Sequence, residues 1–476
     1  MWQTVWLESV PETAVEGLVV TPDLAAGVLE VEVTTTAPTT VQVHLLPSWS
    51  PEGSGEAVVT ASGVSVAGPR GEPVPTTAGH PTAGEAGAGG PVAGPSGRGV
   101  AGGNARAASS DPVAGDGSGW ARTTLRLPIP DVRPWSPEDP HLYGLRVHAG
   151  ADQVASYAAM RSVELASGEH GRPVLLLNGA PYFHAGVLDQ GYWPESLVTP
   201  PSDASMEWDI AAMKDLGYTM LRKHIKIEPL RWYFHADRLG MLVWQDFVNG
   251  GRRYNRAVVQ VPAVMTARID DSSHALFGRQ DEAGREDYWR EAAETVALLR
   301  NSPSIVCWVP FNEGWGQFDA VRVAEAVRGW DPSRLIDHAS GWHDQGAGDF
   351  LSPHIYFREV RPRPEWGADG RAVVLSEYGG YSHAIPGHEF SRREFGYRRF
   401  GSPGELTAAW ERLHREQVVP AVDGGLAGFV YTQLSDVEDE MNGLVTADRT
   451  VVKVEAEVQR AVNAAVRAEF ERVTGG

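Results

Sequence analysis

The amino-acid sequence predicts a chain of two units, an antiparallel β-sandwich followed by a (β/α)8 barrel. In the first part apolar residues recur at every second position, as in LEVEV at 29–33, and this period is typical of half-buried strands. From about Pro173, short apolar runs alternate with segments of helical period and length. Strands that are separated by helices lie parallel, and eight of them fit a closed barrel.

Residues 11–166 carry the period-two pattern and are predicted to form the sandwich. Between about residues 69 and 119 the chain turns into Gly, Ala, Pro and Ser with almost no large apolar residues. Such a stretch cannot bury enough surface to offset its ordering entropy. We therefore expect a disordered insertion at one hairpin of the sandwich.

Residues 170–476 are predicted to form the barrel. One helix is expected to begin at a capping Asp203 and to end at Gly217, and the next has Pro229 in its first turn and ends at Gly240. Further helical segments are expected at about 286–300, 318–330, 404–418 and 452–472. The eight strand candidates contain YFHAGV, TMLRKHI, MLVWQDF, SIVCWVPF, RLIDHAS, FLSPHIYF, AVVLSE and LAGFVYTQL.

Composition and charge exclude several classes of partner. The chain has 476 residues, of which 42% are hydrophobic and 21% charged, as in ordinary globular proteins. Its 41 Lys and Arg against 61 Asp and Glu give a net charge of −20, which repels phosphate backbones and anionic lipid headgroups. No apolar run approaches the roughly 20 residues of a membrane span. We therefore expect no nucleic-acid partner and no membrane partner.

Cys307 is the only cysteine, so an intramolecular disulfide and a cysteine-based zinc site are both excluded. Few cysteines and no disulfide are typical of a reducing compartment. The sequence therefore predicts a cytoplasmic protein.

Two carboxylates occupy the positions where a barrel places its chemistry, at the carboxyl ends of strands. Glu313 follows SIVCWVPFN and Glu377 follows AVVLS. A carboxylate pair across a cleft is the minimum for glycoside hydrolysis, in which one group protonates the leaving oxygen and the other attacks or activates water. Position alone fits equally well with two carboxylates that cap helices or pair with arginine.

Aromatic residues at or just past strand ends favour a sugar site, because the apolar C–H faces of sugars stack on flat rings. These residues are Trp193, Trp315, Trp342, Tyr356, Tyr378, Tyr381 and Tyr431. A metal-dependent hydrolase is the alternative that the histidines and aspartates of this region raise: His338, His343, His354, Asp337, Asp344 and Asp349. Their spacing matches no familiar ligand pattern, so polar or sugar contacts are favoured for them.

Several motifs resemble, in order along the chain, those of glycoside hydrolase family 2, the group of β-galactosidases, β-glucuronidases and β-mannosidases. They are WSPEDPHLYGLRV, GVLDQGYWPE, LRKHIKIEP, DRLGMLVWQDF, WVPFNEGWGQFD, LSEYGGY and YTQLSDVEDEMNGL. The resemblance implies an immunoglobulin-like sandwich before a catalytic (β/α)8 barrel. It implies an exo-acting retaining β-glycosidase that needs no metal and no cofactor. A small glycoside or oligosaccharide is the expected substrate, with β-galactosides slightly preferred, and a homo-oligomer is left open.

The resemblance also implies roles for individual residues. Glu313 is the expected acid/base and Glu377 the expected nucleophile. Asn312 would hydrogen-bond the sugar 2-hydroxyl, while Arg222 and Tyr356 would hold Glu377 ionised and oriented. The remaining expected substrate contacts are His224, Asp246, Trp193, Trp342 and His354.

One departure from the family pattern concerns the start of the chain. Family members begin with a jelly-roll sugar-binding domain, and WQTVWLE at residues 2–8 resembles its final strand. The resemblance thus implies that residues 1–10 are a remnant of a missing jelly-roll domain. The alternative function is therefore a catalytically weak or silent carbohydrate-binding fragment.

Overall fold

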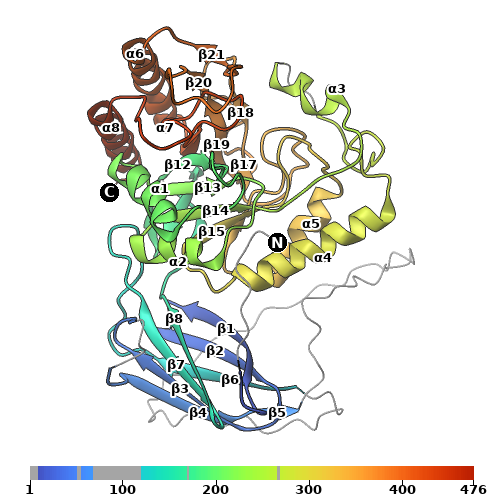
Figure 1. Cartoon of the computed structure of the whole chain (residues 1–476), viewed down its shortest axis with the longest axis vertical. Helices are drawn as coiled ribbons and strands as arrows, with labels where there is room; N and C mark the ends of the chain where they lie inside the picture. The colour runs from blue at the N-terminus through green and yellow to red at the C-terminus, as the bar shows by residue number, and fades with distance from the viewer. Residues whose placement is uncertain (1–8, 51–54, 68–119, 169–170, 265–267, 476) are drawn as a thin grey trace.

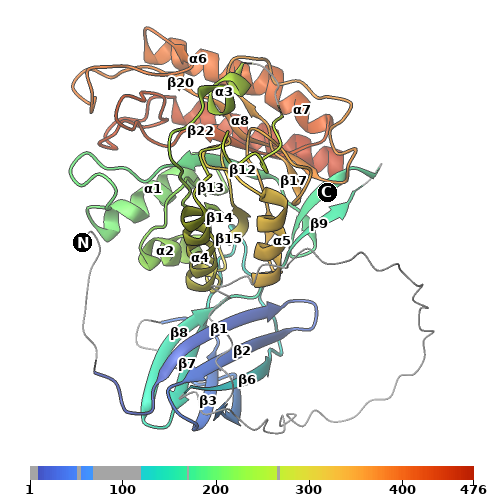
Figure 2. The same cartoon turned by 90° about the vertical axis from the view of Figure 1, so that its right-hand side faces the viewer.

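The computed structural model describes residues 9–50, 55–67, 120–168, 171–264 and 268–475. The antiparallel strands between residues 15 and 158 gather at one end of the molecule, and the parallel strands with their helices lie at the other (Figure 1). A view turned by 90° shows the same division (Figure 2). The predicted insertion and residues 1–8 of the predicted jelly-roll remnant lie outside the described residues.

The N-terminal unit consists of two four-stranded antiparallel sheets. The first has the order β1-β2-β6-β5 (Val15–Asp23, Val28–Thr35, Ala121–Pro128, Val66–Ala67), and the second has the order β4-β3-β7-β8 (Val59–Val64, Thr40–Leu46, Tyr143–Ala149, Asp152–Ala158). Alternate residues such as Val31 of β2 and Val43 of β3 are fully buried in one shared core. The period-two runs thus form strands of two packed sheets, and their immunoglobulin-like class stays a prediction.

A small antiparallel sheet joins this unit to the barrel. It has the order β11-β10-β9 (Ala180–Pro181, Pro173–Leu177, Val163–Ser167). The predicted sandwich boundary at residue 166 therefore falls inside β9, which pairs with β10 and not with the sandwich. The physical reason is that Leu175 and Leu177 of β10 are buried in a core shared with barrel residues such as Val374, which draws their hairpin partner toward the barrel.

All eight predicted barrel runs form parallel strands. They are β12 (His184–Asp189), β13 (Met220–Lys223), β14 (Leu242–Asp246), β15 (Ile305–Val309), β16 (Leu335–Ile336), β17 (Phe350–Leu351) with β18 (His354–Ile355), β19 (Ala372–Gly379) and β22 (Leu426–Thr432). The strand order is β16-β15-β14-β13-β12-β22-β19-β17, with β18 beside β19. The sixth run is split around Pro353, which has no N–H to donate. Between β16 and β17 the Asp349 N–H donates to the Ile336 carbonyl at 2.8 Å, so the barrel is nearly closed.

The predicted helices are present with small shifts at their ends. They are α1 (Asp203–Asp215), α2 (Leu230–Leu239), α4 (Glu282–Leu299), α5 (Ala320–Trp330), α6 (Pro403–Leu413) with a π-turn (His414–Val418) and α7 (Val419–Asp423), and α8 (Ala456–Thr474); a short α3 (Arg256–Val259) and the two-residue strands β20 (Tyr381–Ser382) and β21 (Arg398–Arg399) lie in the loops. Ser202, and not Asp203, caps α1, since its hydroxyl accepts from the Ser205 N–H. Pro229 likewise precedes the first turn of α2 as its N-cap, while Gly240 ends that helix with φ 74° as expected.

Buried hydrogen bonds connect the N-terminal unit to the lower end of the barrel. The Arg161 guanidinium donates to the carbonyls of Pro303 and Ile305, each at 2.7 Å. The Tyr157 hydroxyl donates to Asp237 of α2 at 2.7 Å. These contacts fix the start of β15, whose other end carries Asn312 and Glu313.

None of the helices in the described ranges is both long enough and apolar enough to cross a membrane.

Candidate active site

A cavity of about 770 Å³ opens at the carboxyl ends of the barrel strands. Both strand-end carboxylates, Glu313 and Glu377, line it. Its other described lining residues are Leu188, Gln190, His224, Ile225, Asn249, Tyr254, Val259, Gln260, Ala263, Asn312, Trp315, Trp342, Tyr356, Phe357, Phe395, Tyr397, Thr432 and Glu440. A smaller and mainly apolar groove of about 280 Å³ lies between β10 and α8 and contains neither carboxylate.

The two carboxylates face each other across a short distance. One oxygen of Glu313, one oxygen of Glu377 and a ring nitrogen of His354 lie within 4.8 Å of one another. The Tyr356 hydroxyl lies 2.6 Å from Glu377 Oε2 and 3.4 Å from Glu313 Oε1. Glu313 has a left-handed backbone with φ 51° and precedes Gly314 with φ 73°, a strained conformation of the kind that concentrates at functional sites.

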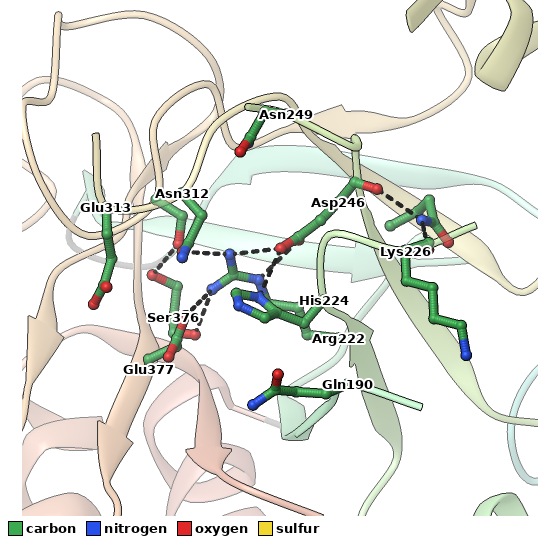
Figure 3. Close-up of polar contacts among 12 residues, drawn as sticks. Gln190, Arg222, His224, Lys226, Asp246, Asn249, Asn312, Glu313, Ser376 and Glu377 are labelled. Atoms are coloured by element: carbon green, nitrogen blue, oxygen red, sulfur yellow. Dashed lines mark hydrogen bonds and ion pairs between the residues drawn. The ribbon is translucent and has the colours of Figure 1, made fainter. Parts of the chain in front are cut away.

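Arg222 holds Glu377, the candidate nucleophile, through a buried hydrogen bond. Its guanidinium donates to Glu377 Oε1 at 3.2 Å, to Asp246 at 2.9 and 3.0 Å, and to Asn312 Oδ1 at 2.8 Å (Figure 3). Burial alone would lower the pKa of Arg222, but the carboxylates of Asp246 and Glu377 raise it above its ordinary value. Arg222 is therefore a permanent buried cation, and Glu377 has this cation on one oxygen and the Tyr356 hydroxyl on the other.

Asp246 was expected to contact substrate, but it does not line the cavity. It is buried and accepts hydrogen bonds from Arg222 and from His224 Nδ1, the latter at 3.0 Å. Burial would lower the pKa of His224, and the hydrogen bond to Asp246 and the charge of Glu377 raise it instead. Asp246 thus positions two side chains of the site, of which only His224 reaches the cavity.

His354 was also expected to contact substrate, and it too lies behind the cavity. Its Nδ1 is 2.8 Å from Glu313 Oε1, and its side chain is fully buried. Burial lowers the pKa of His354 to about 3, so the ring is neutral. Burial also raises the pKa of the Glu313 carboxyl, although His224 and Arg222 oppose this, and the environment of Glu313 therefore favours its acid form. Trp342 lines the cavity, and its contact with substrate stays a prediction.

The expectation for Trp193 is corrected by the structure. Trp193 is not among the described residues that line the cavity. Its ring is buried, and the Arg449 guanidinium lies 3.9 Å from the ring centroid. Arg449 is itself held by an ion pair with Asp209 at 3.1 Å. Because the ring face is already covered, Trp193 packs as part of the barrel rim.

Sequence reasoning missed Glu440, Gln190 and Tyr397, which line the same cavity as the carboxylate pair. Glu440 accepts hydrogen bonds from Gln433 at 2.7 Å and from Gln190 at 3.3 Å. Burial raises the pKa of the Glu440 carboxyl. Tyr397 stacks on Tyr356 with ring centroids 3.7 Å apart and an interplanar angle of 3°. Glu440 lies within the quoted motif YTQLSDVEDEMNGL, which was the one available signal for it.

The histidines that raised the metal alternative do not converge on a shared site in the described residues. His343 Nδ1 accepts from the Ile269 N–H at 3.1 Å, and His338 Nε2 accepts from the Gln345 N–H at 3.0 Å. In the described part of the chain, Glu313, His354 and Glu377 are the one group of three side chains close enough to share an ion. Their facing atoms already bond to one another, to Arg222 or to Tyr356, which fits acid–base work.

Comparison with protein families matches residues 201–466 to "Glycosyl hydrolases family 2, TIM barrel domain". Among curated proteins, a β-galactosidase of Enterobacter cloacae is 26% identical over 358 residues, which cover 70% of this chain and 32% of that protein. A β-galactosidase of Klebsiella pneumoniae (strain 342) is 25% identical, covering 69% of this chain and 31% of that protein. The chain spans about a third of the length of these relatives.

Solved structures share the fold at low identity. A family 2 β-galacturonidase from Eisenbergiella tayi bound to glycerol has a TM-score of 0.61 at 16% identity and covers 96% of this chain and 72% of its own. The β-glucuronidase of Bifidobacterium dentium, complexed with coumarin-3-O-glucuronide, has a TM-score of 0.64 at 14% identity, with 95% and 66% covered. Since the family match takes in more than half of the residues, the chain belongs to glycosyl hydrolases family 2.

Proposed function

We propose that this chain is an exo-acting retaining β-glycosidase with Glu377 as nucleophile and Glu313 as acid/base. The observation that carries the proposal is the contrast between two carboxylates that share the Tyr356 hydroxyl. Glu377 bonds to the cation Arg222, whereas Glu313 bonds to the neutral ring of His354. Retaining enzymes place their carboxyl groups about 5–5.5 Å apart, and inverting enzymes place them about 6.5–9.5 Å apart to admit water. Oxygens within 4.8 Å favour the retaining arrangement.

The double displacement assigns each group a task. In the first step a Glu377 oxygen bonds to the anomeric carbon, while the Glu313 proton goes to the leaving oxygen as the glycosidic bond breaks. In the second step water gives a proton to Glu313, its oxygen bonds to the anomeric carbon, and the bond to Glu377 breaks. Arg222 fixes the Asn312 amide through its oxygen, so the amide nitrogen is the group that can donate to the sugar 2-hydroxyl.

The charges around the cavity favour neutral glycosides over uronides. No Lys or Arg belongs to the cavity lining within the described residues, and Glu440 adds a third carboxylate to Glu313 and Glu377. The carboxylate of a glucuronide or galacturonide would meet the negative charge of Glu377 and the carboxyl oxygens of Glu440, with His224 as its one cationic neighbour in the lining. The curated relatives are β-galactosidases by name, and we propose β-galactosides as the preferred substrates.

Hydrolysis of a panel of 4-nitrophenyl β-galactoside, β-glucoside, β-mannoside and β-glucuronide tests the proposal. We expect turnover of a neutral member, least turnover of the glucuronide, and none in Glu377→Gln. Preferred turnover of the glucuronide would overturn the neutral-sugar assignment. Sugar binding without turnover in either protein would favour the silent carbohydrate-binding alternative.

A further inference from the structure

A chain of hydrogen bonds runs from Glu313 into the wall of the barrel. Glu313 Oε1 is 2.8 Å from His354 Nδ1, and His354 Nε2 is 3.0 Å from Ser340 Oγ. Ser340 Oγ is 2.8 Å from Ser376 Oγ, which is 2.8 Å from the carbonyl oxygen of Ser352. The ring and the three serines are buried, so water does not compete for these contacts.

The final carbonyl fixes the direction of every bond in this chain. A carbonyl oxygen only accepts, so the Ser376 hydroxyl must donate to Ser352. Ser376 then has no second proton, so the Ser340 hydroxyl donates to Ser376. Ser340 is then an acceptor toward the ring, which means that His354 Nε2 carries a proton. A carboxylate oxygen of Glu377 lies 3.7 Å from the same Nε2, and its negative charge favours a proton there.

The neutral ring has only one proton, so Nδ1 presents a lone pair to Glu313. A contact of 2.8 Å between that lone pair and Glu313 Oε1 requires the carboxyl group to supply the proton. The remaining arrangement, a doubly protonated ring, is disfavoured by burial, which lowers the pKa of His354 to about 3.

We propose, on the basis of the proposed glycosidase function, that the serine chain holds His354 as its Nε2–H tautomer and thereby keeps Glu313 in the acid form that glycoside cleavage needs. His354 is then a positioning residue that acts through Glu313. This role deepens the proposed function, because it names the buried groups that keep the Glu313 carboxyl protonated.

The hydrogen-bond chain opposes the effect of several groups that favour the ionised form of Glu313. The charges of Arg222 in β13 and of His224 just after it lower the pKa of the Glu313 carboxyl, and hydrogen bonds from Trp315 and Tyr356 act in the same direction. The carboxylates of Glu377 and Glu440 and the Tyr397 phenol also face this region. A ring that donated from Nδ1 would add a further group that stabilises the anion. A ring that accepts from Glu313 does the opposite.

The same lone pair supports the second chemical step. After Glu313 has protonated the leaving oxygen, its carboxylate faces the bare Nδ1 of His354, and the two lone pairs repel each other. The carboxylate is therefore a stronger base toward the attacking water. The proton that water releases returns to Glu313 and restores the starting hydrogen bond.

Ser376→Ala tests the proposal without altering either carboxylate or the ring. Without Ser376 Oγ, the Ser340 hydroxyl loses its acceptor and turns to donate to His354 Nε2. The ring proton then moves to Nδ1 and donates to the Glu313 carboxylate, so the alkaline limb of the kcat/KM profile moves down by about one pH unit. Ser340→Ala removes the partner of Nε2 directly, and we expect it to shift the limb in the same direction.

Ser352→Ala is the matched control. Its hydroxyl donates to Asp337 at 2.6 Å, and only its backbone carbonyl belongs to the chain. The alkaline limb of this variant should stay at the wild-type position. An unmoved limb in both Ser376→Ala and Ser340→Ala, or an equal shift in the control, would overturn the proposal.

A direct measurement of the tautomer separates this proposal from the proposed function. Two-bond ¹⁵N–¹H correlation spectra of the whole protein distinguish a protonated Nε2 from a protonated Nδ1 without any substrate. The His354 signals are assigned as those absent from His354→Gln. We expect Nε2–H in the wild type and Nδ1–H in Ser376→Ala. A proton on Nδ1 in the wild type would refute the proposed hydrogen-bond chain even if the protein hydrolyses glycosides. A proton on Nε2 would support that hydrogen-bond chain even if the protein hydrolyses no glycoside of the panel.

Discussion

Replacing Tyr356 with Phe removes one hydroxyl from between the two carboxylates. The hydroxyl has a single proton, and it donates this proton to Glu377 Oε2 at 2.6 Å rather than to Glu313 Oε1 at 3.4 Å, because the shorter contact is the stronger hydrogen bond. Burial raises the pKa of Tyr356 well above its ordinary value, so the phenol remains a donor at any working pH. The ring itself is held by stacking on Tyr397 at 3.7 Å. Phe at position 356 therefore keeps its place, and the variant loses the hydrogen bond alone.

The expected cost follows from the charge of the acceptor. A hydrogen bond to a charged group contributes about 1.5–3 kcal/mol, and each 1.4 kcal/mol or so corresponds to about tenfold in rate. If the bond orients Glu377 for attack, kcat/KM of Tyr356→Phe should fall by about 10- to 100-fold. The assay is initial-rate hydrolysis of the best 4-nitrophenyl glycoside.

Tyr288→Phe is the matched control for this change. Its buried hydroxyl donates to the Pro310 carbonyl at 2.9 Å, and Tyr288 does not line the cavity. This variant should lose about 0.5–1.5 kcal/mol of folding stability, as for a neutral hydrogen bond, and keep its kcat/KM. Equal values of kcat/KM in Tyr356→Phe and wild type would refute the assignment of Glu377 as a nucleophile held by Tyr356.

Three further changes test other parts of the site. Glu313→Ala should slow hydrolysis of alkyl β-glycosides by about 10²–10⁴-fold and slow 4-nitrophenyl glycosides less in the first step, because 4-nitrophenolate leaves without a proton; equal losses for both leaving groups would contradict its role as the acid. Treatment with EDTA should leave turnover unchanged, and a loss that added metal restores would revive the metal alternative. Asp337→Asn should raise the Tm at pH 8 more than at pH 5. Burial raises the pKa of Asp337 from 3.8 to about 6, so ionising this carboxyl opposes folding by up to about 3 kcal/mol. This cost is absent below the unfolded-state pKa and complete above the folded-state pKa. A Tm difference that does not grow with pH would contradict this interpretation of Asp337.

The barrel was predictable because its signal is local and repeated. Eight apolar runs separated by helical segments specify parallel strands, and parallel strands bring their carboxyl ends to one face. This geometry is why Glu313 and Glu377, 64 positions apart in the numbering, could be paired from the sequence. The pairing partner of β9 could not be predicted in the same way, since an alternating run does not reveal whether the strand that pairs with it comes before it or after it in the sequence.

The sequence also did not predict which strand-end side chains reach the cavity surface and which lie behind it. Asp246 ends β14, His354 begins the two-residue β18, and Asn312 follows β15 by three positions. All three come from the carboxyl-end face of the barrel, yet Asp246 and His354 lie behind the cavity and hold the residues in front of them. A strand-end position specifies the face of the barrel, and the side-chain length and the partner decide whether a group reaches the substrate. Glu440 and Tyr397 come from irregular loops, where no periodicity predicts direction.

The different chemistry expected of the two carboxylates follows from what the barrel wall places behind each. Behind Glu377, β13 supplies the Arg222 cation, which Asp246 and Asn312 hold in place. Behind Glu313, β18 supplies a neutral imidazole backed by serine hydroxyls and a carbonyl, groups that bear no net charge. Exchanging these two environments would exchange the protonation states, since the carboxyl groups themselves are alike. In the proposed mechanism, the wall therefore decides which carboxylate attacks and which one delivers the proton.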